Sequence, residues 1–349
     1  MSSPYANEDF LRQLLAKAVA AGASDIHLKV GQPPGVRVNG DMAYFRADKL
    51  VAAETEAVVR ILLGDEGTPE RLKALREHDR SYAVEGLGRF RVNIYRQRGT
   101  FAIVLRNIPM KVPSFEELGV PPPVRELALR ERGLVLVVGA AGNGKSTTLA
   151  AMVNHINETQ ASHIVTIEDP VEFIHTDKRS SVSQREIGMD TESFASALRA
   201  ALRQDPDVIL VGEIRDGVTM EIAMQAAETG HLVLSTMHTP DVTRTVNRLL
   251  ALSDNPAELR ERLAQCLQGI VAQRLLPKPS GGLLLLLEIL VATGTAREAL
   301  KRPESSPPLK EVMEKGVTPY GMQTFEMAAR AAVAEGKLSK QVAQQHMGF

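Results

Sequence analysis

A glycine-rich run in the middle of the chain has the residue types and spacing of a phosphate-binding loop. It reads Gly139-Ala-Ala-Gly-Asn-Gly-Lys-Ser146 and fits the pattern G-x-x-x-x-G-K-[ST]. Glycines let such a loop curl until its backbone N–H groups point at phosphate oxygens, and the start of a helix adds a favourable dipole. In this chemistry Lys145 reaches the β- and γ-phosphates, and the Ser146 hydroxyl binds Mg²⁺. The loop therefore predicts a site for a nucleoside triphosphate with Mg²⁺.

The segments on either side of the loop strengthen this interpretation. Residues 134–138 form a short apolar run typical of a buried strand, and residues 147–156 are expected to form a helix. A strand before the motif and a helix after it are the context that a phosphate-binding loop requires. A glycine-rich turn that binds nothing is the alternative, and this context disfavours it. The predicted nucleotide contacts are Gly139, Ala140, Ala141, Gly142, Asn143, Gly144, Lys145, Ser146 and Thr147.

Two carboxylates follow apolar strands further along the chain. Glu213 ends the run that begins at Asp207, and Glu168 ends the run that begins at Ile164. In an open parallel sheet, ligands bind outside the carboxyl ends of the strands, so both acids are expected to project toward the phosphate loop. Phosphoryl transfer needs carboxylates near the metal ion and the attacking water. One acid after a strand is more often a helix cap or a solvated turn, but two beside a phosphate loop reverse that preference.

A third strand, expected over residues 232–235, has a histidine near each end. His231 opens the strand and His238 follows it, so His238 is expected at the carboxyl end of the strand, near a γ-phosphate. A structural role for His238 is equally compatible with the residues alone.

The elements that must position these side chains divide the chain into two parts. Prolines cluster in residues 109–123 and predict a linker between domains at 1–108 and 124–349. The second part alternates apolar strands, at 133–138, 164–167, 208–211 and 232–235, with helices, which is typical of a mostly parallel α/β sheet covered on both faces. The first part is predicted as α+β. It has a helix ending near Gly22 and strands at 24–30, 35–45, 88–96 and 100–108, with Asn39 and Gly40 as a hairpin turn.

The composition of the 349-residue chain excludes some classes of partner and of metal site. The formal net charge is −1, whereas a protein that binds a polyanion usually carries a strong basic excess, so nucleic acid is not expected as a partner. Cys266 is the only cysteine, which excludes an internal disulfide and a cysteine-based zinc site. We expect Cys266 to be a buried thiol within a helix over residues 258–276, where apolar residues recur at helical spacing.

No segment of the sequence predicts a membrane span. Charged residues interrupt the apolar positions of the first helix, so a signal peptide is not expected. The most apolar run, residues 283–290, contains Glu288 and is far shorter than the ~20 residues that cross a bilayer. We interpret this run as a buried strand that follows a turn at Gly281 and Gly282. The chain is therefore expected to be cytoplasmic.

Three further motifs follow the phosphate loop in order: Thr166-Ile-Glu-Asp-Pro-Val-Glu-Phe173, Asp205-Pro-Asp-Val-Ile-Leu-Val-Gly-Glu-Ile-Arg-Asp216 and Ala227-Glu-Thr-Gly-His-Leu-Val-Leu-Ser-Thr-Met-His-Thr239. Together with the loop, they resemble the Walker A, Asp box, Walker B and His box of the secretion-superfamily ATPases. The ends of the chain resemble the PilT-type ATPases that retract type IV pili: their N-terminal domain at residues 22–28 and 89–93, and their C-terminal portion at residues 267–277 and 320–325. The resemblance covers essentially the whole chain.

The resemblance implies a fold and an activity. The fold is a RecA-like P-loop core with a helical C-terminal tail, preceded by a smaller PAS-like domain. The activity is Mg²⁺-dependent ATP hydrolysis by a homo-hexamer that drives pilus retraction and twitching motility through an inner-membrane platform protein. A paralogous retraction ATPase is a further implied partner, and the expected location is the inner-membrane base of the pilus machine. ATP would close the first domain of one subunit onto the core of its neighbour, with the proline-rich linker as the hinge.

The resemblance also implies roles for individual residues. Glu168 would orient or deprotonate water, and Glu213 would support the magnesium ion, although the division of roles between the two acids stays open. His238 would contact the γ-phosphate, with His231 nearby. Two further residues, Arg91 and Arg106, match family positions that approach the nucleotide. Composition alone would make both solvated arginines on the polar face of a sheet. A guanidinium nevertheless suits phosphate, because its planar fork matches the oxygens.

The chain departs from the family pattern in two places. Ala140, Ala141 and Asn143 replace the proline, threonine and serine that are common in the family's loop. Because backbone N–H groups bind the phosphates there, activity is expected to survive. Residues 294–304 replace a segment, similar to Ala-Ile-Arg-Asn-Leu-Ile-Arg-Glu, that many retraction motors need for retraction. This second departure weakens the retraction hypothesis without affecting ATP hydrolysis.

Three other functions stay open. A pilus-assembly or type II secretion ATPase shares the motifs, but such relatives often have longer N-terminal regions and a tetracysteine zinc module. A regulatory subunit that does not hydrolyse ATP is disfavoured by the intact Lys145, Ser146, Glu168 and Glu213. A monomeric small-molecule kinase would leave the first domain unexplained.

Overall fold

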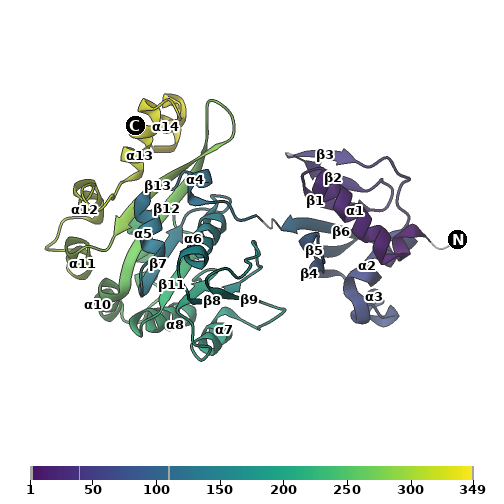
Figure 1. Ribbon diagram of the computed structural model, residues 1–349, viewed down its shortest axis with the longest axis horizontal. Helices are drawn as coiled ribbons and strands as arrows, with labels where there is room; N and C mark the ends of the chain where they lie inside the picture. The colour runs from purple at the N-terminus through teal and green to yellow at the C-terminus, as the bar shows by residue number, and fades with distance from the viewer. Residues whose placement is uncertain (1–2, 39, 109–110, 348–349) are drawn as a thin grey trace. The chain divides into compact units, whose positions relative to one another are not determined.

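The computed structural model describes residues 3–38, 40–108 and 111–347 and divides the chain into two compact units (Figure 1). The first unit is Met1–Lys111 and the second is Val112–Phe349. Each unit has its own apolar core. Within the described residues, no helix combines the length and the apolar character needed to cross a bilayer.

The first unit is a six-stranded antiparallel sheet in the order β3-β2-β1-β6-β5-β4. Helices α1 and α2 cover one face, where apolar side chains alternate along the strands. The strands are β1 (Ala23–Lys29), β2 (Gly35–Val38), β3 (Asp41–Tyr44), β4 (Glu77–Val84), β5 (Gly88–Gln97) and β6 (Thr100–Ile108). The helices are η1 (Pro4–Ala6), α1 (Glu8–Ala20), α2 (Ala52–Leu63), η2 (Gly64–Glu66) and α3 (Pro69–Ala74).

The opening helix and the strands that the sequence predicts for this unit are all present in the structure. The opening helix ends at Ala20, and β2 pairs with β3 as the expected hairpin, although Asn39 of its turn lies outside the described residues. Helices α2 and α3 and strand β4 were not predicted. Strand β4 lacks a clear apolar alternation, because His78 and Arg80 occupy positions opposite Ile94 and Val92.

The second unit contains a seven-stranded sheet in the order β13-β12-β7-β11-β10-β8-β9. Neighbouring strands are parallel except for β12 and β13, which form an antiparallel pair at one edge. The strands are β7 (Gly133–Val138), β8 (His163–Glu168), β9 (Ser181–Glu186), β10 (Val208–Val211), β11 (Leu232–Met237), β12 (Leu267–Pro277) and β13 (Leu283–Val291).

Helices cover both faces of this sheet, since every residue of β7, β10 and β11 is buried. Helix α6 packs against β7 and β11, α5 packs against β12 and β13, and α4 packs against α6. Helices α7 and α8 pack against β7, β8, β10 and β11, and α10 packs against α8. Figure 1 shows α12 and α13 beside β13. The helices are α4 (Phe115–Leu118), α5 (Pro122–Ala128), α6 (Lys145–Thr159), α7 (Phe194–Ala201), α8 (Gly217–Glu228), α9 (Val242–Leu250), α10 (Pro256–Cys266), α11 (Gly294–Lys301), α12 (Leu309–Lys315), α13 (Phe325–Ala334) and α14 (Lys340–Met347).

The helix predicted over residues 258–276 is wrong in its second half. Helix α10 ends at Cys266, and β12 begins at the next residue and runs between β7 and β13. Because β12 is buried on both faces, its apolar residues do not alternate, and their spacing imitated a continued helix. Cys266 is buried, as expected. Burial raises the pKa of its thiol to about 12, with a smaller contribution from Glu228.

The proline-rich segment also differs from a simple linker over 109–123. Val112 is the first residue of the second unit, and the side chains of Phe115, Val120 and Val124 are buried in the core of that unit. The prolines are compatible with this packing because Pro122 lies in the first turn of α5, where its missing N–H costs nothing. Residues 109 and 110 lie outside the described part of the chain.

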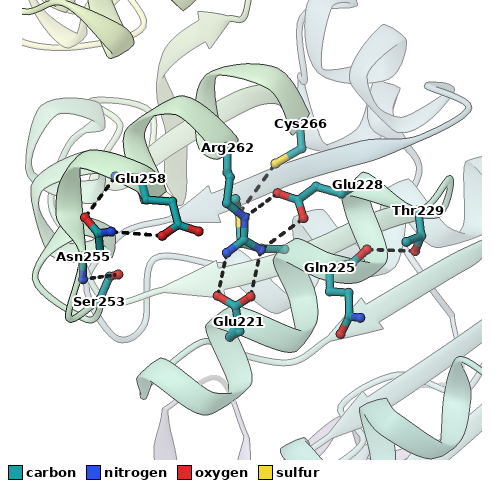
Figure 2. A network of polar contacts seen from close by, with 10 residues as sticks. Glu221, Gln225, Glu228, Thr229, Ser253, Asn255, Glu258, Arg262 and Cys266 are labelled. Atoms are coloured by element: carbon teal, nitrogen blue, oxygen red, sulfur yellow. Dashed lines mark hydrogen bonds and ion pairs between the residues drawn. The ribbon is translucent and has the colours of Figure 1, made fainter.

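A polar network joins α8 to α10 on the outside of the second unit (Figure 2). Arg262 makes two hydrogen bonds to Glu221, at 2.8 and 2.9 Å, and two to Glu228, at 2.8 and 3.1 Å. These bonds raise the pKa of Arg262 above its usual value. At the end of α10, Arg297 of α11 donates to the carbonyls of Ala264 and Gln265. Helix α10 is therefore fastened by charged groups to helices on either side.

Candidate active site

The phosphate loop connects the end of β7 at Val138 to the start of α6 at Lys145, as the sequence predicts. Gly142 and Gly144 have φ angles of 78° and 75°, in the left-handed region that favours glycine. Gly144 immediately precedes α6, so the curled loop leads directly into the positive end of the helix dipole. This is the local geometry that binds phosphate in such loops.

Lys145 lies against the loop itself. Its Nζ donates to the carbonyls of Gly139, at 3.0 Å, and Ala140, at 3.1 Å, and it lies 3.5 Å from Nδ1 of His238. Burial lowers the pKa of the ammonium group, and the negative charge of Glu213 partly opposes this shift. The structure thus brings together the lysine of the loop and the histidine at the end of β11.

The strand order determines which predicted residue lies next to the loop. Strand β11, which leads to His238, is the direct neighbour of β7. Strand β10, which leads to Glu213, comes next, and β8, which ends at Glu168, follows β10. The acids were expected on strands adjoining the loop, but the histidine strand separates both of them from β7. All four strands are parallel, so their carboxyl ends still meet at one edge of the sheet.

Glu213 is the carboxylate that the structure ties to His238. Its side chain is only 12% exposed, and its Oε2 lies 2.5 Å from Nε of Arg215 and 3.7 Å from Nε2 of His238. Because the other ring nitrogen of His238 faces Lys145, the histidine lies between the carboxylate and the ammonium group. Lys145, His238 and Glu213 therefore form one continuous polar cluster.

Glu168 lies in a separate polar setting at the end of β8. Its Oε1 accepts hydrogen bonds from the hydroxyl of Thr166, at 2.7 Å, and from Nε2 of Gln184 on β9, at 3.2 Å. Burial raises the pKa of this carboxyl group, and the two hydrogen bonds lower it by less. A raised pKa makes a carboxylate a better proton acceptor, which is the property of a general base.

Several partners in this site were not foreseen. Arg215 lies within a motif that was recognised, but only geometry shows that its side chain turns back to Glu213. Thr166 precedes Glu168 by two residues in a strand, so period-two alternation could have placed both on one face. Gln184 lies on a strand that was not predicted, and no sequence pattern identifies it.

The donor set fits a magnesium ion bound mainly through a nucleotide. Nowhere in the described part of the chain do three or more His, Cys, Asp or Glu residues gather as metal ligands. Mg²⁺ prefers oxygen ligands and usually keeps water and substrate phosphate in its shell, with one or two protein ligands. The Ser146 hydroxyl at the start of α6 and the Glu213 carboxylate are oxygen donors of this kind.

The structure does not bring His231 to the phosphate loop of its own chain. His231 precedes β11, at the level of Gly133, whereas the loop follows Val138 at the other end of β7. Its Nδ1 lies 3.0 Å from the carbonyl oxygen of Ala226, which is a local contact at the end of α8. The order of the residues already places the two histidines at opposite ends of one short strand, so only the family resemblance suggested that His231 lies near the nucleotide.

Arg91 and Arg106 lie side by side on the sheet face of the first unit that the helices do not cover. The register pairs Arg91 of β5 with Arg106 of β6, and both side chains are exposed. Nε of Arg106 bonds Oδ1 of Asp25 at 2.9 Å. Burial raises the pKa of Asp25, but hydrogen bonds from Arg106 and Ser24 outweigh this effect and hold it below its usual value. Like charges directly opposite each other are unfavourable, and the carboxylate of Asp25 offsets the charge of Arg106.

Comparison with known proteins is consistent with this geometry. The family model described as "Type II/IV secretion system protein" matches residues 4–281. The chain belongs to the type II/IV secretion system protein family. Within it, the chain is 40% identical to the type IV pilus retraction ATPase PilT of Pseudomonas aeruginosa over 96% of its own length and 97% of PilT. It is 38% identical to the type IV pilus ATPase PilU of the same organism, over 96% of this chain and 87% of PilU.

A solved structure of the same family extends the likeness to three dimensions. The crystal structure of the pilus retraction motor PilT with bound ADP superposes with a TM-score of 0.88 at 40% identity, covering 95% of each chain. This match confirms the predicted fold class, a RecA-like core preceded by a smaller α+β domain. The helical C-terminal tail of this family member is also present, as α11 to α14.

Proposed function

We propose that the chain is an ATP-hydrolysing motor that drives retraction of type IV pili. The observation that carries this proposal is the cluster of Lys145, His238 and Glu213 at the loop, in a chain that matches PilT over nearly its full length. The cluster supports triphosphate chemistry because a cation, an acid and a group able to reach the γ-phosphate meet at one sheet edge.

Each residue has a role in this proposal. The loop N–H groups and Lys145 hold the phosphates, His238 contacts the γ-phosphate, and Glu168 orients and deprotonates the attacking water. Ser146 and Glu213 would hold Mg²⁺, which neutralises negative charge on the phosphates. Arg215 holds the carboxylate of Glu213 in place, and Nε2 of His238 lies 3.7 Å from it. Thr166 and Gln184 hold the carboxylate of Glu168 through hydrogen bonds.

The coupling to mechanical work is proposed at the level of a homo-hexamer. Arg91 and Arg106 of one subunit would approach the triphosphate bound by its neighbour, and they would lose this attraction when phosphate leaves. The junction between the first and the second unit would act as the hinge. The resulting motion would act on an inner-membrane platform protein at the base of the pilus machine.

A second candidate is a PilU-like role beside a paralogous retraction motor. The chain is 38% identical to PilU, and one observation favours this role: residues 294–304 lack the segment that many retraction motors carry. In the structure, this region includes α11, which fastens to α10 through Arg297.

Pilus imaging in a deletion strain tests the proposal. We expect excess pili that do not retract, restored to normal by the wild-type gene but not by Lys145→Ala. Loss of pili would instead show an assembly motor. Normal retraction that fails only when a paralogue is also weakened would favour the PilU-like role.

A further inference from the structure

The phosphate loop is attached to β12 as well as to the two elements that it connects. Nε2 of Gln273 donates to the backbone carbonyl of Asn143 at 2.5 Å, and the side-chain Oδ1 of Asn143 accepts from the backbone N–H of Leu275 at 3.1 Å. The two contacts join one loop residue to two alternate residues of the strand. Loop and strand are therefore held together at the turn that leads into α6.

The close approach of β12 to two glycines of the loop also shows that the loop and the strand are in contact. A Cβ atom on Gly139 would lie 2.6 Å from the carbonyl oxygen of Gln273, which is closer than real Cβ contacts. A Cβ atom on Gly144 would lie 3.5 Å from Nε2 of Gln273. Both ends of the loop thus lie directly on one residue of β12. Gly139 has to be glycine here for space, in addition to its φ angle.

The Gln273 side chain is fully buried, yet it makes little use of its hydrogen-bonding groups. Its exposed fraction is 0%, and its Oε1 has no hydrogen-bond partner among the described residues. Burying an unpaired amide oxygen costs free energy, and an apolar side chain of equal length would avoid this cost. Stability alone therefore does not account for a glutamine at this position. Among the described residues, the one hydrogen bond that the Gln273 side chain makes is to the phosphate loop.

We propose that Gln273 is a positioning residue of the nucleotide site, acting together with Asn143. The glutamine amide fixes the carbonyl of Asn143, which keeps the adjoining N–H groups of the loop turned toward the phosphates. This inference rests on the proposed ATP-binding function. It also gives a role to Asn143, because its side chain is one bond longer than serine and can reach the N–H of Leu275.

A matched pair of glutamine variants tests this role. Gln273→Met removes the amide but keeps the length and burial of the side chain. Gln268→Met is the control, because Gln268 is a partly buried residue of the same strand that lies against Gly133, at the opposite end of β7 from the loop. The measurements are the dissociation constants for ATP and ADP and the thermal unfolding midpoint without nucleotide.

We expect Gln273→Met to weaken binding of both nucleotides about tenfold while the unfolding midpoint stays equal or rises. Gln268→Met should leave both affinities unchanged. Asn143→Ala, a loop substitution that leaves the strand intact, should weaken binding in the same direction and carries the test if Gln273→Met does not fold.

The outcomes separate this inference from the function on which it rests. Unchanged nucleotide affinity in Gln273→Met or, should that variant not fold, in Asn143→Ala would overturn the positioning role and leave the ATPase proposal standing. A lowered unfolding midpoint with unchanged affinity would show that Gln273 is purely structural. Failure of the wild-type protein to bind ATP would overturn both.

Discussion

Glu168 shows how a single residue can be unfavourable for the fold and useful for the chemistry. Burial raises the pKa of its carboxyl group, so the ionised form is destabilised in the folded protein. The hydrogen bonds from Thr166 and Gln184 end on the same oxygen, and the backbone of Glu172 is a further donor to this carboxylate. A glutamine could present its carbonyl oxygen to the same two donors. The charge itself is therefore not needed for the local structure.

Glu168→Gln is expected to reduce phosphate release by about a hundredfold or more, because the proton acceptor is lost. ATP affinity should be retained, since the phosphate loop is unchanged. Steady-state phosphate release and equilibrium ATP binding check the two parts separately. Hydrolysis at the wild-type rate would remove Glu168 from the mechanism.

The same substitution has a pH-dependent effect on stability. A carboxyl group whose folded-state pKa is raised contributes stability below its ordinary pKa of 4.5 and loses it as the pH rises through the folded-state value. Glu168→Gln removes this loss. The unfolding midpoint of the variant should therefore rise relative to that of the wild type as the pH is increased from about 4.5 to 8. A difference that is constant with pH, or opposite in sign, would contradict the assignment.

At the scale of residues, the sequence predicted the members of the site better than the contacts between their side chains. Lys145, Glu213 and His238 were expected together and meet in the structure. His231 was expected near the site, but it lies at the amino-terminal end of β11, away from the loop. Motifs record residue types along a strand, but contacts such as Arg215 with Glu213 depend on side-chain direction, which a pattern does not specify.

At the scale of elements, α10 connects the helix that follows Glu213 to the segment in which this chain departs from the retraction motors. Arg262 fastens α10 to α8, and Arg297 fastens it to α11 (Figure 2 for Arg262). Arg262 is only a quarter exposed, so its bonds are less screened than those of a surface pair.

Arg262→Ala is expected to lower the free energy of unfolding of the second unit by about 1–2 kcal/mol. Lys315→Ala is the control, because it breaks an exposed pair with Glu311 on a single helix and should cost at most about 0.5 kcal/mol. Denaturant titration of both variants measures the difference. Equal losses would show that the α8–α10 network adds no more than an ordinary surface pair.

Secondary structure was predicted correctly where the hydrophobic periodicity and the neighbouring segments indicated the same element. The strands around the phosphate loop lie between clear helices, and β7, β8, β10 and β11 were all expected. Strand β12 was interpreted as helix because a strand buried on both faces has no alternation to distinguish it. This error also concealed Gln273, since a residue assigned to a helix far from the loop gives no reason to examine it.

At the scale of the whole molecule, the paired arginines of the first unit are proposed to act in the assembled ring. Arg91→Ala and Arg106→Ala are expected to reduce ATPase activity at concentrations that permit rings, each by about tenfold or more. Arg12→Ala is the control, because Arg12 lies on α1, over the opposite face of the sheet, in an exposed pair with Glu8. Wild-type hydrolysis in the double variant would remove both arginines from the site.

The proposed motor function depends most directly on the binding and cleavage of triphosphate at the loop between β7 and α6. Phosphate release from ATP by purified protein, with and without Mg²⁺, measures this cleavage for the wild type, Lys145→Ala and Gln268→Met. We predict Mg²⁺-dependent release by the wild type and Gln268→Met, and neither ATP binding nor release by Lys145→Ala. Release by Lys145→Ala at the wild-type rate would contradict the account.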